Sequence, residues 1–388
     1  SPAARAALVA AILASSMAFA DGAIVNLLLP LIQRDLGADI VDQQWIVESY
    51  LLTLSALVLA GGALGDRIGR RRVFGWGVAL FALASLACGL APDPLTLILA
   101  RALQGVGAAL LVPGSLSLIA AAYPPGERGR AIGVWSAASA LTTALGPLLG
   151  GLIADFVSWR WAFFINLPVA AAVLIILPRI AESRGVQTDG IDWIGAAFAA
   201  LAMGGLAAGF IEMGAHGADL LSFGLLALGG IGAAAFIQRQ RLAAAPMIPR
   251  GLFAIPVFAA ANGATLMIYA ALSGALFLLP YNLVMLQGWS ALETSLALTP
   301  FVAAIAGLSR VFGSLADRFG FKPFLVWGPL LAAFGFALMA LPGADAVYWR
   351  DVLPGVAVAG LGMAIVVAPL TAAVMGCVGR TMSARLRA

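Results

Sequence analysis

Long runs of apolar residues, separated by short stretches that hold most of the charged residues, make up this chain. One membrane-spanning helix takes about 20 apolar residues. Short connections place successive helices side by side and antiparallel. The pattern predicts twelve membrane helices, over residues 8–30, 45–65, 73–91, 94–122, 131–154, 161–178, 193–212, 220–237, 256–280, 292–309, 323–341 and 352–376.

The composition agrees with this pattern and excludes several classes of protein. Of the 388 residues, 62% are hydrophobic and 10% are charged, whereas a soluble domain has about 25% charged residues. So few charges exclude a disordered chain and a nucleic-acid-binding protein. The two cysteines and the single histidine provide neither a zinc cluster nor a catalytic triad. We therefore expect an all-α polytopic membrane protein that is not an enzyme and holds no metal.

The distribution of basic residues indicates which helix ends face the cytoplasm. If the amino terminus is cytoplasmic, 18 of the 22 Lys and Arg residues fall on the cytoplasmic side. Arg34, Arg160 and Arg350 fall on the opposite side, and Arg101 lies within a predicted span. Basic residues are enriched in cytoplasmic connections of membrane proteins. We therefore expect a multi-pass protein of the cell inner (cytoplasmic) membrane, with both termini cytoplasmic.

Two segments near helix ends are near copies of each other. Residues 62–71, the first copy, read GALGDRIGRR, and residues 313–322, the second copy, read GSLADRFGFK. Transporters built from two homologous six-helix halves would carry such copies six helices apart. Here the copies follow the second and the tenth predicted helices, which are eight apart. Two helices must therefore be inserted between the halves.

This offset predicts a domain organisation. We expect an N-terminal six-helix bundle over residues 1–180, two inserted linker helices over 181–250, and a partial C-terminal bundle of four helices over 251–388. Four predicted helices follow the first copy within its half, but only two follow the second copy. We therefore expect a C-terminal half that lacks its last two helices.

Three ionisable residues fall inside predicted spans, where charge is costly and usually functional. They are Asp21, Glu48 and Arg101. Burial in a medium of low dielectric constant raises the pKa of a carboxyl group, which suits such a group to proton exchange near neutral pH. We interpret these residues as candidates for proton coupling. The alternatives are an Asp21–Arg101 ion pair that only fixes two helices, and a structural role for Glu48.

Two further motifs are candidates for conformational roles. In the first copy, an Asp can accept hydrogen bonds at a helix N-terminus and basic residues can pair with it, so the segment could latch two helix ends as a gate. Anchoring by basic residues alone would not explain the spaced glycines. The fifth span ends in small residues and a Pro, which allow close packing and bend a helix; the alternative is generic packing. The candidate gating residues are Gly62, Asp66, Arg67, Gly69, Arg70, Arg71, Asp317 and Arg318, and those of the fifth span are Gly146, Pro147, Gly150 and Gly151.

In this order, the motifs resemble those of the major facilitator superfamily, and most of all its fourteen-span drug:proton antiporter branch. Residues 62–72 resemble the superfamily signature between helices 2 and 3. Residues 97–109 (LILARALQGVGAA) resemble the helix 4 motif, whose arginine, here Arg101, the family links to proton coupling. Residues 146–151 (GPLLGG) resemble the antiporter motif of helix 5. The helix 1 and helix 2 motifs of the branch resemble residues 21–30 and 45–50.

The resemblance implies an antiporter that exports small amphipathic or cationic compounds by alternating access, as multidrug efflux proteins do. A proton gradient would supply the energy, without a cofactor. We expect a monomer whose partners are the lipid bilayer, the substrate and protons, and no nucleic acid. Uptake by symport or uniport on the same fold, and a truncated homologue that does not transport, are the alternatives. The candidate residues of the substrate cavity are Asn26, Gln104, Asn262 and Tyr269.

Overall fold

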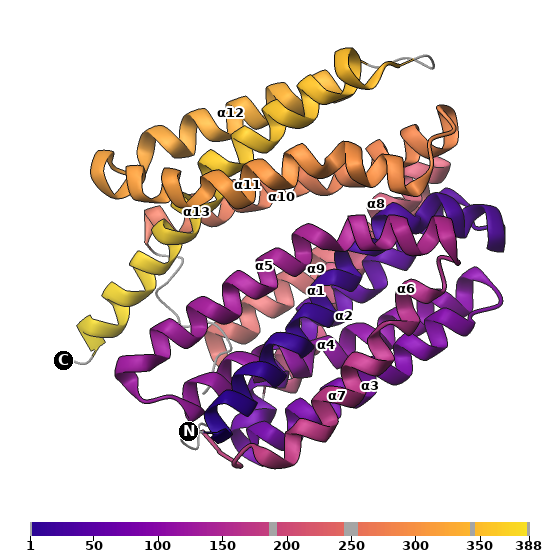
Figure 1. The fold of residues 1–388 in the computed structure, drawn as a ribbon. Helices are drawn as coiled ribbons and strands as arrows, with labels where there is room; N and C mark the ends of the chain where they lie inside the picture. Colours follow the sequence, from indigo (N-terminus) through magenta and orange to yellow (C-terminus); the bar gives the residue numbers. More distant parts are fainter. Residues whose placement is uncertain (1, 186–191, 244–254, 342–345, 386–388) are drawn as a thin grey trace. The chain divides into compact units, whose positions relative to one another are not determined.

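The computed structural model describes residues 2–185, 192–243, 255–341 and 346–385, and within these ranges the chain is helical and without β-strands (Figure 1). Twelve helical segments among these residues are long and apolar enough to cross a membrane. The expected fold class and number of membrane helices are confirmed. In chain order, the first elements are α1 (Pro2–Leu36), α2 (Ile40–Ile68), α3 (Arg70–Leu90), α4 (Pro94–Ala122), α5 (Pro125–Phe156), α6 (Trp161–Phe164), α7 (Asn166–Ile176), the 3-10 turn η1 (Leu177–Arg179), α8 (Trp193–His216) and α9 (Leu220–Leu242). The remaining elements are α10 (Pro256–Tyr281), the π-helical turn η2 (Asn282–Leu286), α11 (Ala291–Phe319), α12 (Lys322–Met339), the π-helical turn η3 (Tyr348–Val352) and α13 (Leu353–Arg385).

Helices run beyond the apolar segments that predicted them, and the connection left between the predicted spans 45–65 and 73–91 is almost entirely helical. Helix α2 continues to Ile68 and α3 begins at Arg70, so only Gly69 of the first copy lies outside a helix. Gly69 has a φ angle of 132°, a conformation that residues with a side chain rarely adopt. A single glycine therefore turns the chain between the two helices, which hydropathy alone does not reveal.

Side-chain oxygens cap the start of several helices. Asp39, Asp93 and Asp219 each accept a hydrogen bond, at 2.8–2.9 Å, from the backbone N–H three residues further on. Such bonds satisfy N–H groups that have no partner within the helix. Hydrogen bonds from Thr96 hold the pKa of Asp93 below its usual value, and those from Ser222 do the same for Asp219. The caps at Asp93 and Asp219 start α4 and α9 where the sequence predicted them, whereas the cap at Asp39 starts α2 before the predicted residue 45.

The chain divides into two compact units. The first comprises residues 1–146 and 156–247, and the second comprises residues 147–155 and 248–388. In the first unit, α4 packs against α1, α2 and α3, while α8 packs against both α9 and α2. The fully buried side chains of its apolar core include Phe74, Val78, Phe81 and Leu111.

In the second unit, α13 packs against α10, α11 and α12. The apolar core of this unit includes Leu283, Val352, Val356 and Val366. Among the described residues, the buried polar side chains of this unit are the uncharged Thr294 and Ser295, whereas the first unit buries the charged Asp21 and Arg101.

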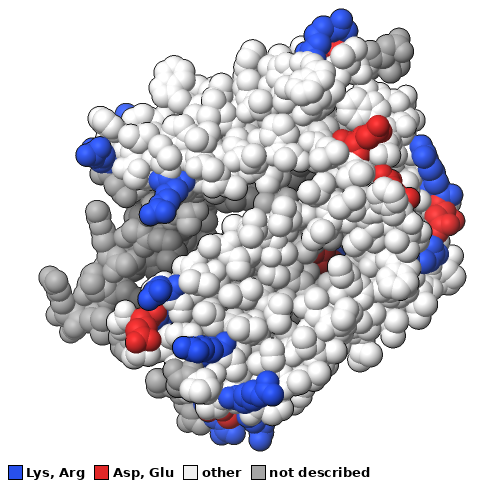
Figure 2. Space-filling view, viewed as in Figure 1, with Lys and Arg blue, Asp and Glu red and all other residues white. Residues whose placement is uncertain are grey.

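The surface of the protein is largely apolar. On the face drawn in Figure 2, charged side chains gather near helix ends and the surface between them is almost uncharged. Large apolar side chains such as Leu83, Ile175 and Ile231 are more than 60% exposed. An apolar surface of this extent is unfavourable in water and favourable in hydrocarbon. The helices are therefore embedded in lipid.

Candidate functional site

Asp21 lies in the interior of the first unit, midway along α1, and its side chain is only 1% exposed. Arg101 of α4 forms an ion pair with it, donating from Nη1 to the carboxylate oxygen Oδ2. The other oxygen, Oδ1, accepts from Gln104 Nε2 at 2.8 Å and from Asn166 Nδ2 of α7 at 3.2 Å. A buried carboxylate is costly unless it is paired and hydrogen-bonded. Three donors from two helices meet this requirement.

Arg101 is held from several sides as well. Its Nε donates to the backbone oxygen of Ile46 at 3.1 Å, and Nη1 also donates to Gln104 Oε1 at 2.6 Å. The guanidinium carbon lies 4.4 Å from the centre of the Tyr50 ring, and a cation over an aromatic face is stabilised. A Cβ atom on Gly105 would lie 2.3 Å from the backbone oxygen of Tyr50. Glycine at that position therefore lets α4 approach α2 closely enough for these contacts.

Two residues that the sequence analysis missed complete the arrangement. Ser85 Oγ of α3 accepts from Gln104 Nε2 at 2.8 Å and from Asn166 Nδ2 at 3.2 Å. Asn166 lies within a predicted span, so a search for amides as well as charges inside spans would have found it. A single Ser in an apolar helix gives no comparable signal, because Ser is common there. We call the set the polar network; its members are Asp21, Tyr50, Ser85, Arg101, Gln104 and Asn166.

In the polar network, the negative charge of Asp21 is balanced by the positive charge of Arg101. Arg101 also contacts the neutral acceptors Gln104 Oε1 and Ile46 O and the Tyr50 ring. The network therefore encloses a paired carboxylate in the interior of the first unit, where an unpaired ion would be costly.

Glu48 does not join the polar network. It lies on α2 and is half-buried. Among the described residues, no hydrogen bond or ion pair to its carboxylate is present. It is therefore a carboxylate inside a membrane helix without a protein partner, unlike Asp21.

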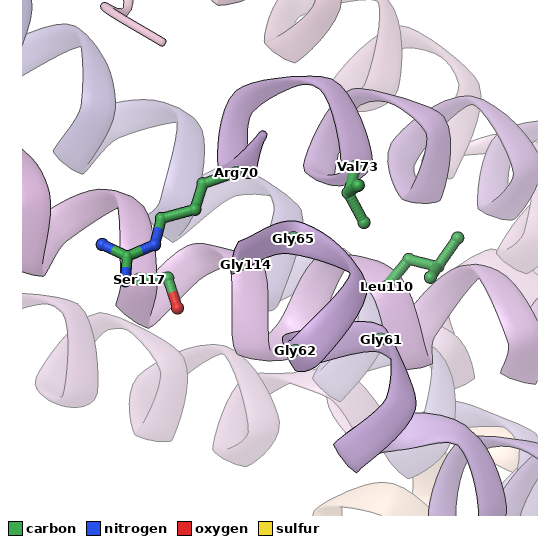
Figure 3. Close-up of a pocket in the computed structure, with 8 residues that line it drawn as sticks. All are labelled: Gly61, Gly62, Gly65, Arg70, Val73, Leu110, Gly114 and Ser117. Carbon is green, nitrogen blue, oxygen red and sulfur yellow. The ribbon is translucent and has the colours of Figure 1, made fainter. Parts of the chain in front are cut away.

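The first copy carries an ion pair of its own. Arg70 Nε lies 2.7 Å from Asp66 Oδ1, and both side chains are partly exposed. Arg67 is exposed and Gly62 half-buried. A small pocket opens beside Arg70 between α2, α3 and α4, where glycines leave space (Figure 3). The residues that line it are Gly61, Gly62, Gly65, Arg70, Val73, Leu110, Gly114 and Ser117.

The second copy also has a glycine between two helices, but there Gly320 and Phe321 both lie between α11 and α12. Gly320 ends α11 with a φ angle of 82°, and a Cβ atom there would meet nothing within 4 Å. Arg318 is exposed. Asp317 lies on α11, and its side chain is outside the described part of the chain.

The small residues of α5 lie at close helix contacts. A Cβ atom on Gly146 would lie 3.3 Å from the Cβ atom of Ala23 on α1, and one on Gly151 would lie 2.8 Å from the backbone oxygen of Ala291. Gly150 is buried, and Pro147 is half-buried within the helix.

The candidate residues of the substrate cavity are divided between the two units. Gln104 belongs to the polar network. Asn26, on α1, donates to the backbone oxygen of Gly22 in its own helix at 3.5 Å. In the second unit, Asn262 donates to the backbone oxygen of Phe258 at 2.8 Å, and Tyr269 is 47% exposed. The side chains of Asn26 and Asn262 thus satisfy carbonyls of their own helices.

Twelve apolar helices in the described part of the chain, with a buried ion pair inside one of the two units, are typical of a multi-pass membrane protein. The sequence pattern of the Major Facilitator Superfamily matches residues 11–386, and the chain belongs to this superfamily. It is a transporter and not an enzyme.

The chain is similar in sequence to two curated relatives and similar in fold to one solved structure. It is 37% identical over 376 residues to the puromycin resistance protein of Streptomyces alboniger, covering 93% of this chain and 73% of the relative. It is 37% identical over 331 residues to the tetracenomycin C resistance and export protein of Streptomyces glaucescens, covering 84% of this chain and 61% of the relative. A POT family transporter in complex with 5-aminolevulinic acid has a TM-score of 0.68 at 15% identity, covering 95% of this chain and 83% of that structure. The last comparison concerns the fold alone.

Proposed function

We propose that this chain is a proton-coupled antiporter that exports small amphipathic or cationic compounds across the cytoplasmic membrane by alternating access. The observation that carries the proposal is the buried Asp21–Arg101 ion pair, whose carboxylate also accepts hydrogen bonds from Gln104 and Asn166. Two relatives named for antibiotic resistance, one of them also for export, support the direction of transport. The proton gradient is the energy source, and no cofactor takes part.

The polar network supplies a link between proton and substrate. With Asp21 ionised its net charge is zero, and with Asp21 protonated its net charge is +1. A cationic substrate is bound less favourably near a net positive charge in a medium of low dielectric constant. Proton uptake from outside therefore promotes substrate release, and proton loss to the cytoplasm restores binding. A pH difference of one unit supplies about 1.4 kcal/mol per proton, which sustains about a tenfold substrate gradient.

The remaining parts of the chain have proposed roles in the same cycle. Both termini and both copies of the repeated segment lie on the cytoplasmic side, where the copies act as gates, and Gly146–Gly151 allows α5 to pack closely. The α8–α9 hairpin, which packs on α2, is an insert between two halves that begin at residues 1 and 251. The transporter acts as a monomer.

The proton site is tested by removing one carboxylate and sparing its counterpart on the same helix. We expect Asp21→Asn to reduce pH-driven efflux of ethidium from proteoliposomes by about tenfold or more, the factor that corresponds to 1.4 kcal/mol. The matched control is Asp35→Asn, because Asp35 also lies on α1 and pairs with an arginine, Arg160, but is 47% exposed. Undiminished efflux in Asp21→Asn would place the proton site elsewhere. Ethidium movement in the direction of the protons would indicate uptake by symport.

Glu48, which has no partner among the described side chains, is the proposed second carboxylate for doubly charged substrates. One proton exchanged for one monovalent cation is electroneutral, whereas a divalent cation needs two protons. We expect Glu48→Gln to lower efflux of a divalent dye by severalfold and that of ethidium by less than about twofold. Measured initial rates for both dyes in the same vesicles decide this point, and equal losses for the two would remove the proposed role.

A further inference from the structure

The segment that follows α7 and η1 crosses the junction between α2 and α3. We call residues 180–185 the strap. The backbone N–H of Arg70, the first residue of α3, donates to the backbone oxygen of Ser183 at 2.9 Å. The backbone N–H of Gly185 donates to the backbone oxygen of Asp66, near the end of α2, at 3.0 Å. The strap therefore satisfies one free group on each of the two helix ends that meet at Gly69.

Glu182 caps α3 from outside that helix. Its Oε1 accepts from the backbone N–H of Arg71 at 3.0 Å, and its Oε2 lies 3.8 Å from the Nε atoms of both Arg71 and Arg72. Arg71 Nη1 in turn donates to the backbone oxygen of Ile180 at 2.9 Å. A carboxylate at a helix N-terminus is stabilising. Gly69, at the position before α3, has no side chain with which to provide this cap.

Two glycines allow the strap to lie this close. A Cβ atom on Gly69 would lie 2.8 Å from the carboxyl carbon of Glu182. A Cβ atom on Gly185 would lie 2.5 Å from the carboxyl carbon of Asp66. Each glycine thus faces the acidic side chain of the opposite segment. Gly69 thus provides space for this contact as well as the backbone conformation of the turn.

We propose that Glu182 is a positioning residue for transport: through the strap it fixes the α2–α3 junction that carries Asp66, Arg70 and Arg71. This inference rests on the proposed function of that junction as a gate. Glu182 touches neither the polar network nor Asp21 in the described structure. Its loss therefore slows the conformational cycle and leaves substrate affinity in place.

The test uses the full chain in proteoliposomes with ethidium as the probe. We expect Glu182→Ala to lower the maximal rate by about three- to fivefold, which is the size of a lost helix cap, with the KM for ethidium unchanged. Glu182→Gln keeps an acceptor for the Arg71 N–H and should lose less than about twofold. Gly185→Ala should resemble Glu182→Ala, and because both act through one strap the double variant should be little slower than either.

Matched controls exclude a general loss of stability. Glu127→Ala makes the same change at an exposed position. Arg128→Gln removes an exposed arginine that lies outside both copies and should be nearly silent, whereas Arg71→Gln should not be. An unchanged maximal rate in Glu182→Ala, a raised KM instead, or equal losses in the controls would overturn the proposal.

Amide hydrogen exchange separates the failure of this inference from the failure of the proposed function. Exchange at Arg70 and Arg71 needs no transport activity. If wild-type vesicles show no pH-driven efflux, the proposed function fails, and faster exchange at both amides in Glu182→Ala still supports the strap. Unchanged exchange at those amides would overturn it.

Discussion

Helix α1 carries two aspartate–arginine pairs, one inside the protein and one near its surface, and their local geometry is nearly the same. Arg101 pairs with Asp21, donates to a backbone oxygen and stacks on Tyr50 at 4.4 Å. Arg160 pairs with Asp35, donates to the backbone oxygen of Ala91 at 3.1 Å and stacks on Trp159 at 4.3 Å. Residue types and contacts alone would not tell the two pairs apart.

The two pairs differ in how deeply they are buried and in the further hydrogen-bond partners of the aspartate. Both side chains of the inner pair are 1% exposed, whereas those of the outer pair are 30% and 47% exposed. Two amides, Gln104 and Asn166, hold the inner carboxylate, whereas the described partners of Asp35 are Arg160 and the Trp159 indole. Water can replace either partner of the outer pair. A change of charge therefore has large consequences only at the inner pair.

The largest expected difference between the two pairs concerns their arginines. Arg101→Ala leaves the Asp21 carboxylate buried without a cation, and removing one partner of a buried pair costs about 3–5 kcal/mol. Arg160→Ala breaks an exposed pair worth about 0–1 kcal/mol. Apparent melting temperatures of the purified variants in detergent measure this difference. Similar temperatures for the two variants would show that the inner pair is not sealed from water.

A smaller effect is expected from the amide that only the inner pair possesses. Asn166→Leu removes a donor to Asp21 and to Ser85 and leaves both groups short of a partner, at a cost of about 1–3 kcal/mol. The control is Asn262→Leu, because Asn262 bonds only to a carbonyl of its own helix. We expect pH-driven efflux to fall severalfold in the first variant and to change little in the second. If Asn262→Leu were the more harmful, the second unit would hold the more important polar site.

The smallest effect is expected at the aromatic ring under Arg101. Tyr50→Phe keeps the ring and loses only the hydrogen bond from the hydroxyl to the backbone oxygen of Ala18, at 3.3 Å. We expect a loss of less than about 1 kcal/mol and nearly normal efflux. Tyr50→Leu also removes the ring face and should lose more. Initial rates for the two variants, normalised to protein per vesicle, provide the comparison.

Much of the fold follows from the sequence because lipid imposes a simple rule. Backbone groups in hydrocarbon must be paired within a helix, so an apolar run of sufficient length becomes a membrane helix. Charge is costly there, and that rule also singled out Asp21, Glu48 and Arg101. Helix ends were less predictable, because α1 and α2 continue into polar surroundings where hydropathy carries no signal.

The partners of the charged residues could not be read from the sequence. Asn166 and Ser85 join the polar network because their side chains point into it once the helices have packed. The sequence alone does not show that direction. Glu182 acts on a backbone N–H 111 residues away in sequence, through an irregular segment without periodicity. The repeated copies were recognisable by their letters, but only the structure shows that Gly69 faces Glu182 while Gly320 faces open space.

The movement of protons during transport tests the proposed antiport most directly. Proteoliposomes with equal pH on both sides, a clamped membrane potential and a trapped pH indicator receive ethidium on the outside. In antiport, ethidium entry drives protons out, so we expect the interior to become alkaline with the wild-type chain and with Asp35→Asn, and to stay unchanged with Asp21→Asn. An interior that acidifies, ethidium entry without a pH change, or a full response from Asp21→Asn would contradict proton exchange at Asp21.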